Sequence, residues 1–227
     1  MLLTFNRISQ NGADRIGLDP QALVIAGWAG RDEHAIQHHI EELAAIGVPP
    51  PSSVPVYYRA SASNLTQSER VEFLGTDSSG EVEPVLVALA DGYWIGIGSD
   101  HTDRKAETAG IALSKQLCAK PIGKTLWRLD ELEAHWDQII LRSWATIDGE
   151  RVLYQEGTLA ALRTPQDLID RRPSGLEIAP GTVMYCGTLG AIGGIRPGSR
   201  FEMELADPVL TRVIRHAYEI ETLPVVS

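Results

Sequence analysis

The chain has 227 residues, of which 44% are hydrophobic and 22% charged, the composition of an ordinary globular protein with ample apolar material for a core. Its net charge of −10 makes a nucleic-acid backbone or an anionic membrane surface an unfavourable partner. Two cysteines, Cys118 and Cys186, are too few for a disulfide scaffold, so we expect reduced thiols in a cytoplasmic protein. No apolar run approaches the roughly 18 residues of a membrane span, and the N-terminus lacks the apolar core of a signal peptide.

The first part of the chain combines short strands with one longer helix. Residues 22–26 are a strand candidate, and apolar residues at helical spacing predict a helix from about Asp32 to Ile46. Gly47 and the prolines that follow it end this helix. Two further short strands are expected at 54–59 and 69–74.

Two glutamates and an aspartate separated by one hairpin are the most informative feature of the sequence. The residues between them form two apolar, β-rich runs joined at Asp91 and Gly92, a dipeptide favoured in two-residue turns. Because side chains alternate along a strand, Glu81 and Glu83 share one face, and the hairpin returns the chain so that Asp100 arrives beside them. Three converging carboxylates repel one another unless a cation neutralises them, and all-oxygen ligation suits Mg²⁺, Mn²⁺ or Ca²⁺. On spacing alone, two solvated glutamates and a polar turn are the alternative interpretation.

The second half of the chain is expected to be mostly strand and turn. A helix-like stretch from Lys105 to Lys120 is followed by a β-rich or mixed segment at 130–141 and by a hairpin around Asp148 and Gly149. A short helix is predicted at 164–169, with proline in its favoured first turn. The pattern is β-dominated with a few helices, which indicates the α+β class rather than a doubly wound sheet.

A series of short segments in the C-terminal third follows one another in a recognisable order. The segments are Ile-Asp-Gly-Glu at 147–150, Tyr-Gln-Glu-Gly-Thr at 154–158, Leu-Ile at 168–169, and the longer stretches 176–188 and 195–204. This series resembles the core of the fumarylacetoacetate hydrolase superfamily, and several ordered matches are more specific than any single one. The resemblance implies a mixed β-sheet roll with a few peripheral helices. It divides the chain into an N-terminal strand or arm at 1–21 and a single catalytic domain at 22–227.

The resemblance also implies a metal site. Glu81 and Glu83 look like the superfamily's metal-binding Glu-x-Glu pair, and Asp100 looks like its later metal-binding aspartate. Mg²⁺ is the first choice of ion, with Mn²⁺ or Ca²⁺ as alternatives. Asp103 is a rival third ligand, because Lys105 stands where the superfamily often has another aspartate.

Three catalytic residues follow from the same resemblance. Lys115, ahead of a Pro-x-Gly segment, resembles the active-site lysine. His39 and Glu42 resemble a His-x-x-Glu dyad on the superfamily's lid helix, where the histidine would hold a water and the glutamate would orient it. His38 and Glu41 have the same spacing, so the assignment of the dyad is open.

Four further residues are expected to bind substrate. Arg59 follows an aromatic pair where the superfamily usually has a lysine, and it keeps the charge but changes the donor geometry. Gln155, Gly187 and Thr188 would line the pocket, where glycine allows the backbone to approach a ligand closely.

The implied function is a divalent-metal-dependent hydrolase that cleaves a C–C bond next to a carbonyl in a small oxo-acid or diketo-acid. A hydratase, decarboxylase or tautomerase of 2-oxo acids is the first alternative, and a non-catalytic small-molecule binder is the second. We expect a small anionic carbonyl substrate, a homodimer, and neither nucleic acid nor membrane as a partner.

Overall fold

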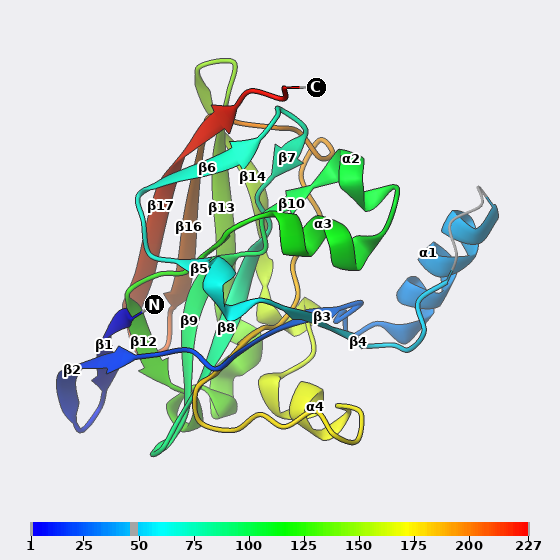
Figure 1. Cartoon of the computed structure of the whole chain (residues 1–227). Coiled ribbons are helices and arrows are strands. Elements are labelled where there is room, and N and C mark those ends of the chain that lie inside the picture. The colour runs from blue at the N-terminus through cyan, green and yellow to red at the C-terminus, as the bar shows by residue number, and fades with distance from the viewer. Residues whose placement is uncertain (1, 46–49, 227) are drawn as a thin grey trace.

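The computed structural model describes residues 2–45 and 50–226, and within the helix at 33–45 it leaves out the side chains of residues 39 and 42–45 (Figure 1). The largest element is an eight-stranded mixed sheet. In order across the sheet its strands are β2 (Gly12–Leu18), β1 (Leu3–Ser9), β12 (Thr125–Arg128), β9 (Gly92–Ser99), β8 (Val82–Leu89), β15 (Thr182–Tyr185), β3 (Ala22–Gly27) and β4 (Val56–Ala60).

A five-stranded sheet packs against one face of the larger sheet. Its strands, in order, are β14 (Glu150–Thr158), β13 (Ile140–Ile147), β16 (Arg200–Asp207), β17 (Arg212–Leu223) and β6 (Arg70–Leu74). Two short pairs complete the β-structure: β7 (Ser78–Ser79) with β10 (Thr102–Asp103), and β5 (Leu65–Thr66) with β11 (Lys120–Pro121).

The helices are few and lie around the sheets (Figure 1). They are α1 (Glu33–Ala45), α2 (Arg104–Glu107), α3 (Ile111–Leu117) and α4 (Pro165–Asp170), with 3₁₀ turns η1 (Ala62–Asn64), η2 (Leu129–Glu131), η3 (Glu133–Gln138) and η4 (Leu159–Ala161). In the described part of the chain, no helix is both long and apolar enough to cross a membrane. The predicted β-dominated α+β class, with mixed sheets and peripheral helices, is confirmed.

The central strands of the large sheet are apolar on both faces. Met184 and Leu86 point into the core shared with the five-stranded sheet, where they join residues such as Phe201. Their neighbours Val85 and Tyr185 point to the opposite face, where a second apolar cluster forms. Burial on both faces explains why these strands are continuous apolar runs in the sequence rather than alternating ones.

The hairpin that carries the acidic motif forms as expected, but its turn is displaced by one residue. Leu89 pairs with Gly92, so the two turn residues are Ala90 and Asp91 rather than Asp91 and Gly92. Gly92 takes a φ of +123° directly after the turn, a conformation that glycine adopts readily. The second predicted hairpin turn, at Asp148 and Gly149, is confirmed.

Two expected segments differ from the structure. The helix-like stretch at 105–120 is broken at Gly110 into α2 and α3 and ends in the short strand β11. The mixed segment at 130–141 consists mainly of 3₁₀ turns before β13 begins at Ile140. The helix predicted at 32–46 is α1, and its expected end at Gly47 lies outside the described residues.

Candidate metal centre

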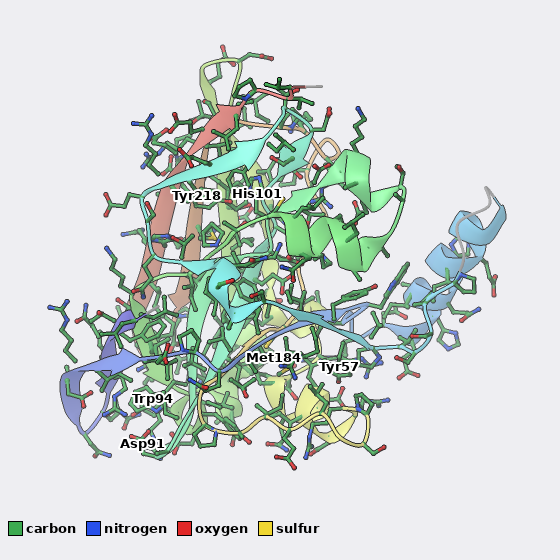
Figure 2. All side chains as sticks on the ribbon, in the orientation of Figure 1. Tyr57, Asp91, Trp94, His101, Met184 and Tyr218 are labelled. Carbon is green, nitrogen blue, oxygen red and sulfur yellow. The ribbon has the colours of Figure 1, made fainter. Side chains whose placement is uncertain are left out.

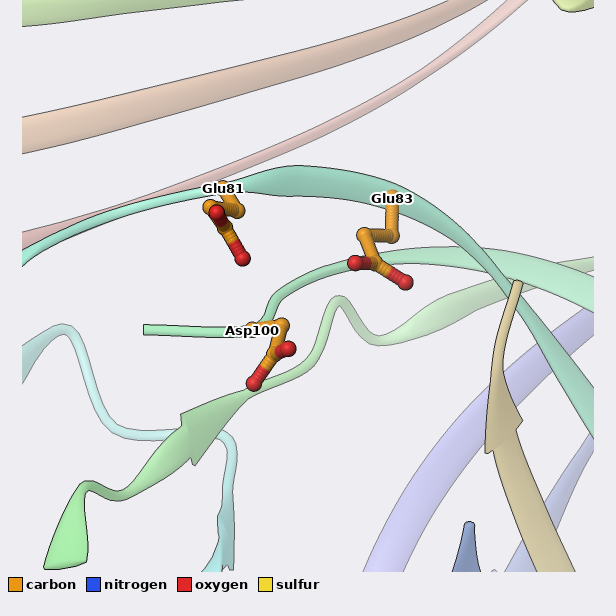
Figure 3. A group of neighbouring side chains, drawn as sticks. All are labelled: Glu81, Glu83 and Asp100. Carbon is orange, nitrogen blue, oxygen red and sulfur yellow. The ribbon is translucent and has the colours of Figure 1, made fainter. Parts of the chain in front are cut away.

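The acidic motif converges at one end of the β8–β9 hairpin. Val82 pairs with Ser99 at the end of the two strands, and the backbone N–H of Asp100 donates to the carbonyl oxygen of Glu81 at 2.9 Å. This pairing places one carboxylate oxygen from each of Glu81, Glu83 and Asp100 within 4.8 Å of the others (Figure 3). The three acidic side chains come together as the alternation along the strand and the return of the hairpin predicted.

Glu83 is an acidic side chain deep in the protein, only 2% exposed. Burial raises its pKa well above the usual range, and the neighbouring Asp100 and Glu81 raise it further. The backbone N–H of Gly187 donates to its Oε2 at 2.7 Å. Gly187 has a φ of +98°, and a Cβ there would lie 2.7 Å from the Cβ of Ala29, so only glycine fits at this position.

Asp100 is completely buried between two lysines. Its Oδ2 accepts a hydrogen bond from Lys115, and its Oδ1 lies 3.0 Å from the Nζ of Lys120. Burial opposes ionisation of Asp100, but the two ammonium groups outweigh it and hold the pKa of Asp100 below the usual range. Lys120 donates its hydrogen bond to the carbonyl oxygen of His101 at 2.5 Å, and within the described residues Oδ1 of Asp100 accepts no hydrogen bond.

Glu81 lies nearer the surface and is paired with Arg104. The Nη2 of Arg104 lies 3.0 Å from Oε1 of Glu81, and Lys115 lies 3.5 Å from its Oε2. Arg104 is also bound by the hydroxyl of Ser79 at 2.8 Å and by Glu107 at 3.2 Å. Three cations therefore compensate three carboxylates, and Lys115 contacts two of those carboxylates at once.

The donor set fits a hard divalent cation. All three candidate ligands are carboxylate oxygens, and two oxygens on opposite sides of a Mg²⁺ ion lie about 4.2 Å apart, close to the spread observed here. The buried Oδ1 of Asp100 has the Lys120 ammonium beside it but accepts no hydrogen bond within the described residues, and buried Glu83 is disfavoured as an anion beside its acidic neighbours. A divalent ion would relieve both conditions, provided that Lys115 moves aside.

A cavity of 540 Å³ opens onto the three carboxylates. Lys115 and Gly187 lie on its wall together with Thr188. Its other lining includes the loop after β3 around Trp28, the start of α1, and Tyr58 of β4. This volume lies within the range of pockets that bind small organic molecules.

A second layer of hydrogen bonds supports the loop behind Asp100. His101 is fully buried, stacks on Phe73 with ring centroids 3.7 Å apart, and is bound by the hydroxyls of Ser78 and Tyr218, each at 2.9 Å. Figure 2 shows His101 and Tyr218 beside each other. Burial and the charge of Lys120 lower the pKa of His101 far below its usual range, so the ring is neutral.

The residues expected to bind substrate lie in three different environments. Thr188 lines the cavity and donates to the carbonyl oxygen of Val82 at 2.8 Å. Gln155 is buried behind the site, where its amide nitrogen donates to Thr188 and its oxygen accepts from the backbone N–H of Val82. Arg59 is exposed and does not line the cavity, whereas its neighbour Tyr58 does.

The predicted dyad lies only partly within the described structure. The backbone of His39 and Glu42 belongs to α1, whose first turn borders the cavity, but their side chains are outside the described part. The alternative pair, His38 and Glu41, is exposed, and Glu41 accepts a hydrogen bond from Gln37 at 2.9 Å. The rival metal ligand Asp103 is turned away to cap α2, accepting from the backbone N–H of Ala106.

The sequence did not indicate Lys120 or Tyr58. Lys120 is fully buried although its side chain is charged. In the sequence, only its position two residues after Cys118 suggested that this segment enters the core. Tyr58 follows another tyrosine in a short strand, and which of the two faces the site depends on the register of β4.

Comparison with solved structures shows which fold this is. The structure of Cg1458 with an inhibitor matches with a TM-score of 0.68 and 16% identity over 94% of this chain and 81% of that one. A 2-keto-3-deoxy-D-arabinonate dehydratase complexed with magnesium and 2,5-dioxopentanoate matches with a TM-score of 0.65 and 14% identity over 95% and 78% of the two chains. Yeast ynq8, a fumarylacetoacetate hydrolase family protein, matches with a TM-score of 0.61 and 15% identity over 91% and 95%.

At these identities the similarity shows a shared fold, so the predicted fumarylacetoacetate hydrolase-like architecture is confirmed. No curated protein matches the sequence. A family model described as "Protein of unknown function (DUF2848)" matches residues 26–218, and the chain therefore belongs to this family, with the fold of the fumarylacetoacetate hydrolases.

Proposed function

We propose that this protein is a divalent-metal-dependent enzyme that breaks a bond next to a carbonyl in a small 2-oxo acid or diketo-acid. The observation that carries the proposal is the convergence of Glu81, Glu83 and Asp100 on a cavity that Lys115 also lines. A solved protein of the same fold, the arabinonate-derived dehydratase, contains magnesium and a dioxo-acid, which supports the same class of ligand here.

A divalent ion held by the three carboxylates would act as a Lewis acid and stabilise the negative charge that develops on the carbonyl oxygen. Residues of the chain would bind the substrate and hold the acidic side chains in position. Lys115, released from Asp100 and Glu81, would bind the substrate carboxylate through its ammonium. Arg104 would keep Glu81 in position, and Lys120 would keep Asp100 in position. Gly187 would keep Glu83 pointed at the site through its backbone N–H.

Hydrolysis of a C–C bond is the first candidate reaction, and it requires the histidine of the α1 dyad to hold a water near the cavity. Dehydration, decarboxylation or isomerisation of a 2-oxo acid is the second candidate. It is supported by the dehydratase of the same fold that was solved with magnesium and 2,5-dioxopentanoate. We also propose that the protein is a cytoplasmic homodimer, as expected from the sequence.

The test combines metal binding with turnover. The metal-loaded protein is incubated with acylpyruvates and 2-oxo acids, the ultraviolet absorbance of the enol is followed, and the products are identified. Two acids would indicate hydrolysis, and carbon dioxide or loss of water would indicate the second candidate. In parallel, titration calorimetry measures Mn²⁺ binding to the parent, to Glu83→Gln, and to Glu150→Gln, which makes the same charge change at the β13–β14 hairpin outside the cavity.

We expect Glu83→Gln to weaken Mn²⁺ binding by about a hundredfold or more and to abolish turnover, with Glu150→Gln like the parent. If Glu83→Gln bound Mn²⁺ as the parent does, the metal centre would be wrong. Metal binding without turnover of any compound would instead favour a non-catalytic binding protein.

A further inference from the structure

The cavity offers one positive charge to a ligand and several negative ones. Among its described lining residues, Lys115 is the single cationic side chain. Beyond the three candidate metal ligands, two more acidic side chains, Asp32 and Glu107, lie on the wall. A bound divalent ion would be shared between its protein ligands and the oxo-acid head, which leaves Lys115 as the single free cation among the described lining residues for a substrate carboxylate.

The other cationic side chains near the metal centre, Arg104 and Lys120, already bind oxygen atoms of the protein. Arg104 is held by Ser79, Glu81 and Glu107, so each part of its guanidinium group has a protein oxygen beside it. Lys120 is fully buried against Asp100 and the carbonyl oxygen of His101. If Lys120 turned toward a ligand, buried Asp100 would lose one of its cations, and if Arg104 did so, partly buried Glu81 would lose one.

Two arginines near the start of α1 also form ion pairs within the protein. Arg163 is 4% exposed and pairs with Glu33 at 2.8 Å and with Asp167 at 2.9 Å. Arg31 makes a two-pronged ion pair with Asp137, at 2.8 and 2.7 Å. Arg59, the cation that the sequence suggested for substrate binding, points away from the cavity.

Away from the carboxylates, much of the cavity wall is apolar or aromatic. Trp28, Ile36, Tyr58, Ile111 and Leu189 all line it, and all five are partly exposed. They come from the loop after β3, from α1, β4 and α3, and from the segment after β15. A cavity of 540 Å³ has room for more than a three-carbon oxo-acid, and such a wall stabilises a ligand in proportion to the apolar area that it buries.

We propose that the substrate is a monocarboxylic 2-oxo acid or diketo-acid with an uncharged apolar tail, and that dicarboxylic acids are rejected. This inference rests on the proposed function, because it places the oxo-acid head at the metal centre and Lys115. The tail then lies along the apolar wall. A second carboxylate at the end of the tail would lose water, find no free cation among the described lining residues, and lie near Glu107 or Asp32.

A matched pair of ligands tests the proposal directly. 2-Oxopentanoate and 2-oxopentanedioate have the same five-carbon chain and differ only in the terminal carboxylate. Calorimetry in the presence of Mg²⁺ is expected to show at least tenfold tighter binding of the monocarboxylate, and tighter binding again of 2-oxooctanoate. Equal or tighter binding of 2-oxopentanedioate would overturn the inference.

The acidic wall can be tested by a variant. Glu107→Gln removes a negative charge from the wall and releases one nitrogen of Arg104. It is expected to shift the ratio of the affinities for 2-oxopentanedioate and 2-oxopentanoate about three- to fivefold toward the dicarboxylate. Glu150→Gln, with the same change in net charge outside the cavity, should alter neither. An unchanged ratio of the two affinities in Glu107→Gln would contradict the role of the wall.

Pyruvate separates this inference from the proposed function. It carries the oxo-acid head without a tail, so its binding should require Mg²⁺ whatever the tail preference is. If pyruvate binding needs Mg²⁺ but the five-carbon pair is not discriminated, the tail inference alone fails. If neither pyruvate nor the longer acids bind in a metal-dependent way, the proposed function fails and the substrate class falls with it.

Discussion

Lys115 and Lys120 reach different oxygens of the same carboxylate, and their surroundings give them different roles. Lys115 lies on the cavity wall and also contacts Glu81, and from this position we propose that it binds a substrate carboxylate. The opposing carboxylates outweigh its burial and raise the pKa of Lys115 above its usual range, so it remains an ammonium. Lys120 has no exposed surface, so its ammonium stays paired with Asp100.

Replacing Lys120 tests this role. Lys120→Met leaves Asp100 buried with one cation fewer, and breaking a buried pair in this way should lower the free energy of unfolding by about 3 kcal/mol. Urea unfolding measures the change. Lys105→Met, which removes the same charge from an exposed position on α2, should stay within about 0.5 kcal/mol of the parent. Similar unfolding of the two variants would mean that Lys120 does not stabilise the buried carboxylate.

Single residues also show where sequence reasoning stops. Tyr58 and Arg59 are neighbours, and one faces the cavity while the other faces solvent because side chains alternate along β4. A motif can place such a pair near a site, but only the register against β3, where Ile25 pairs with Tyr58, decides which residue enters it.

At the scale of elements, the β8–β9 hairpin brings the acidic side chains together even though its turn is one residue away from the predicted position. Strand pairing explains this tolerance, since Val82 opposite Ser99 determines where Asp100 arrives. The predicted helix at 105–120 is divided at Gly110, and Asp103 becomes the cap of α2 instead of a metal ligand. Helical periodicity alone did not reveal this break.

The segment after β15 supplies a backbone donor that a substitution can test. Gly187→Ala introduces a Cβ against Ala29, at a φ of +98°, and should displace the N–H that binds Glu83. We expect a loss of about 2 to 4 kcal/mol in the free energy of unfolding and at least tenfold weaker Mn²⁺ binding.

Gly149→Ala is the matched control for that substitution. Gly149 has a φ of +81°, but nothing lies within 4 Å of its Cβ position, so it reports the backbone cost alone. It should lose about 1 kcal/mol and bind Mn²⁺ normally. Equal stability losses and equal metal affinities in the two variants would show that the close approach at Gly187 has no special importance.

At the scale of the whole molecule, two sheets enclose one large core, and the N-terminal strands extend the larger sheet. β1 runs parallel to β12, and β12 pairs with β9, the strand that leads into Asp100.

Burial between the sheets also affects His216 of β17, whose Nε2 is buried and has no hydrogen-bond partner in the described part of the chain.

This histidine should make stability depend on pH. Burial, with a smaller contribution from Lys124, lowers the pKa of His216 to about 4, whereas in the unfolded chain it titrates near about 6.5. The unfolded state therefore binds the proton more readily, so stability is complete above about pH 6.5 and falls as the pH decreases toward 4. Between pH 7.5 and pH 5, this group alone should cost about 2 kcal/mol.

Urea unfolding at the two pH values, for the parent and for His216→Gln, isolates that contribution. The variant should lose about 2 kcal/mol less than the parent between pH 7.5 and pH 5, because the other titrating groups are common to both proteins. Parallel pH dependences for the two proteins would show that His216 is as easily protonated in the folded state as in the unfolded one.

The β-dominated class, the hairpin, and the convergence of Glu81, Glu83 and Asp100 could be predicted from the amino-acid sequence. These features depend on short-range patterns, namely alternation along strands and a turn that brings nearby residues together. The role of Lys120, the hydrogen bond from Gly187 to Glu83, and the presence of a single cation among the described lining residues became visible only in the folded structure. They depend on side chains from separate strands and helices, and their burial and charge balance arise only when both sheets and the helices are packed.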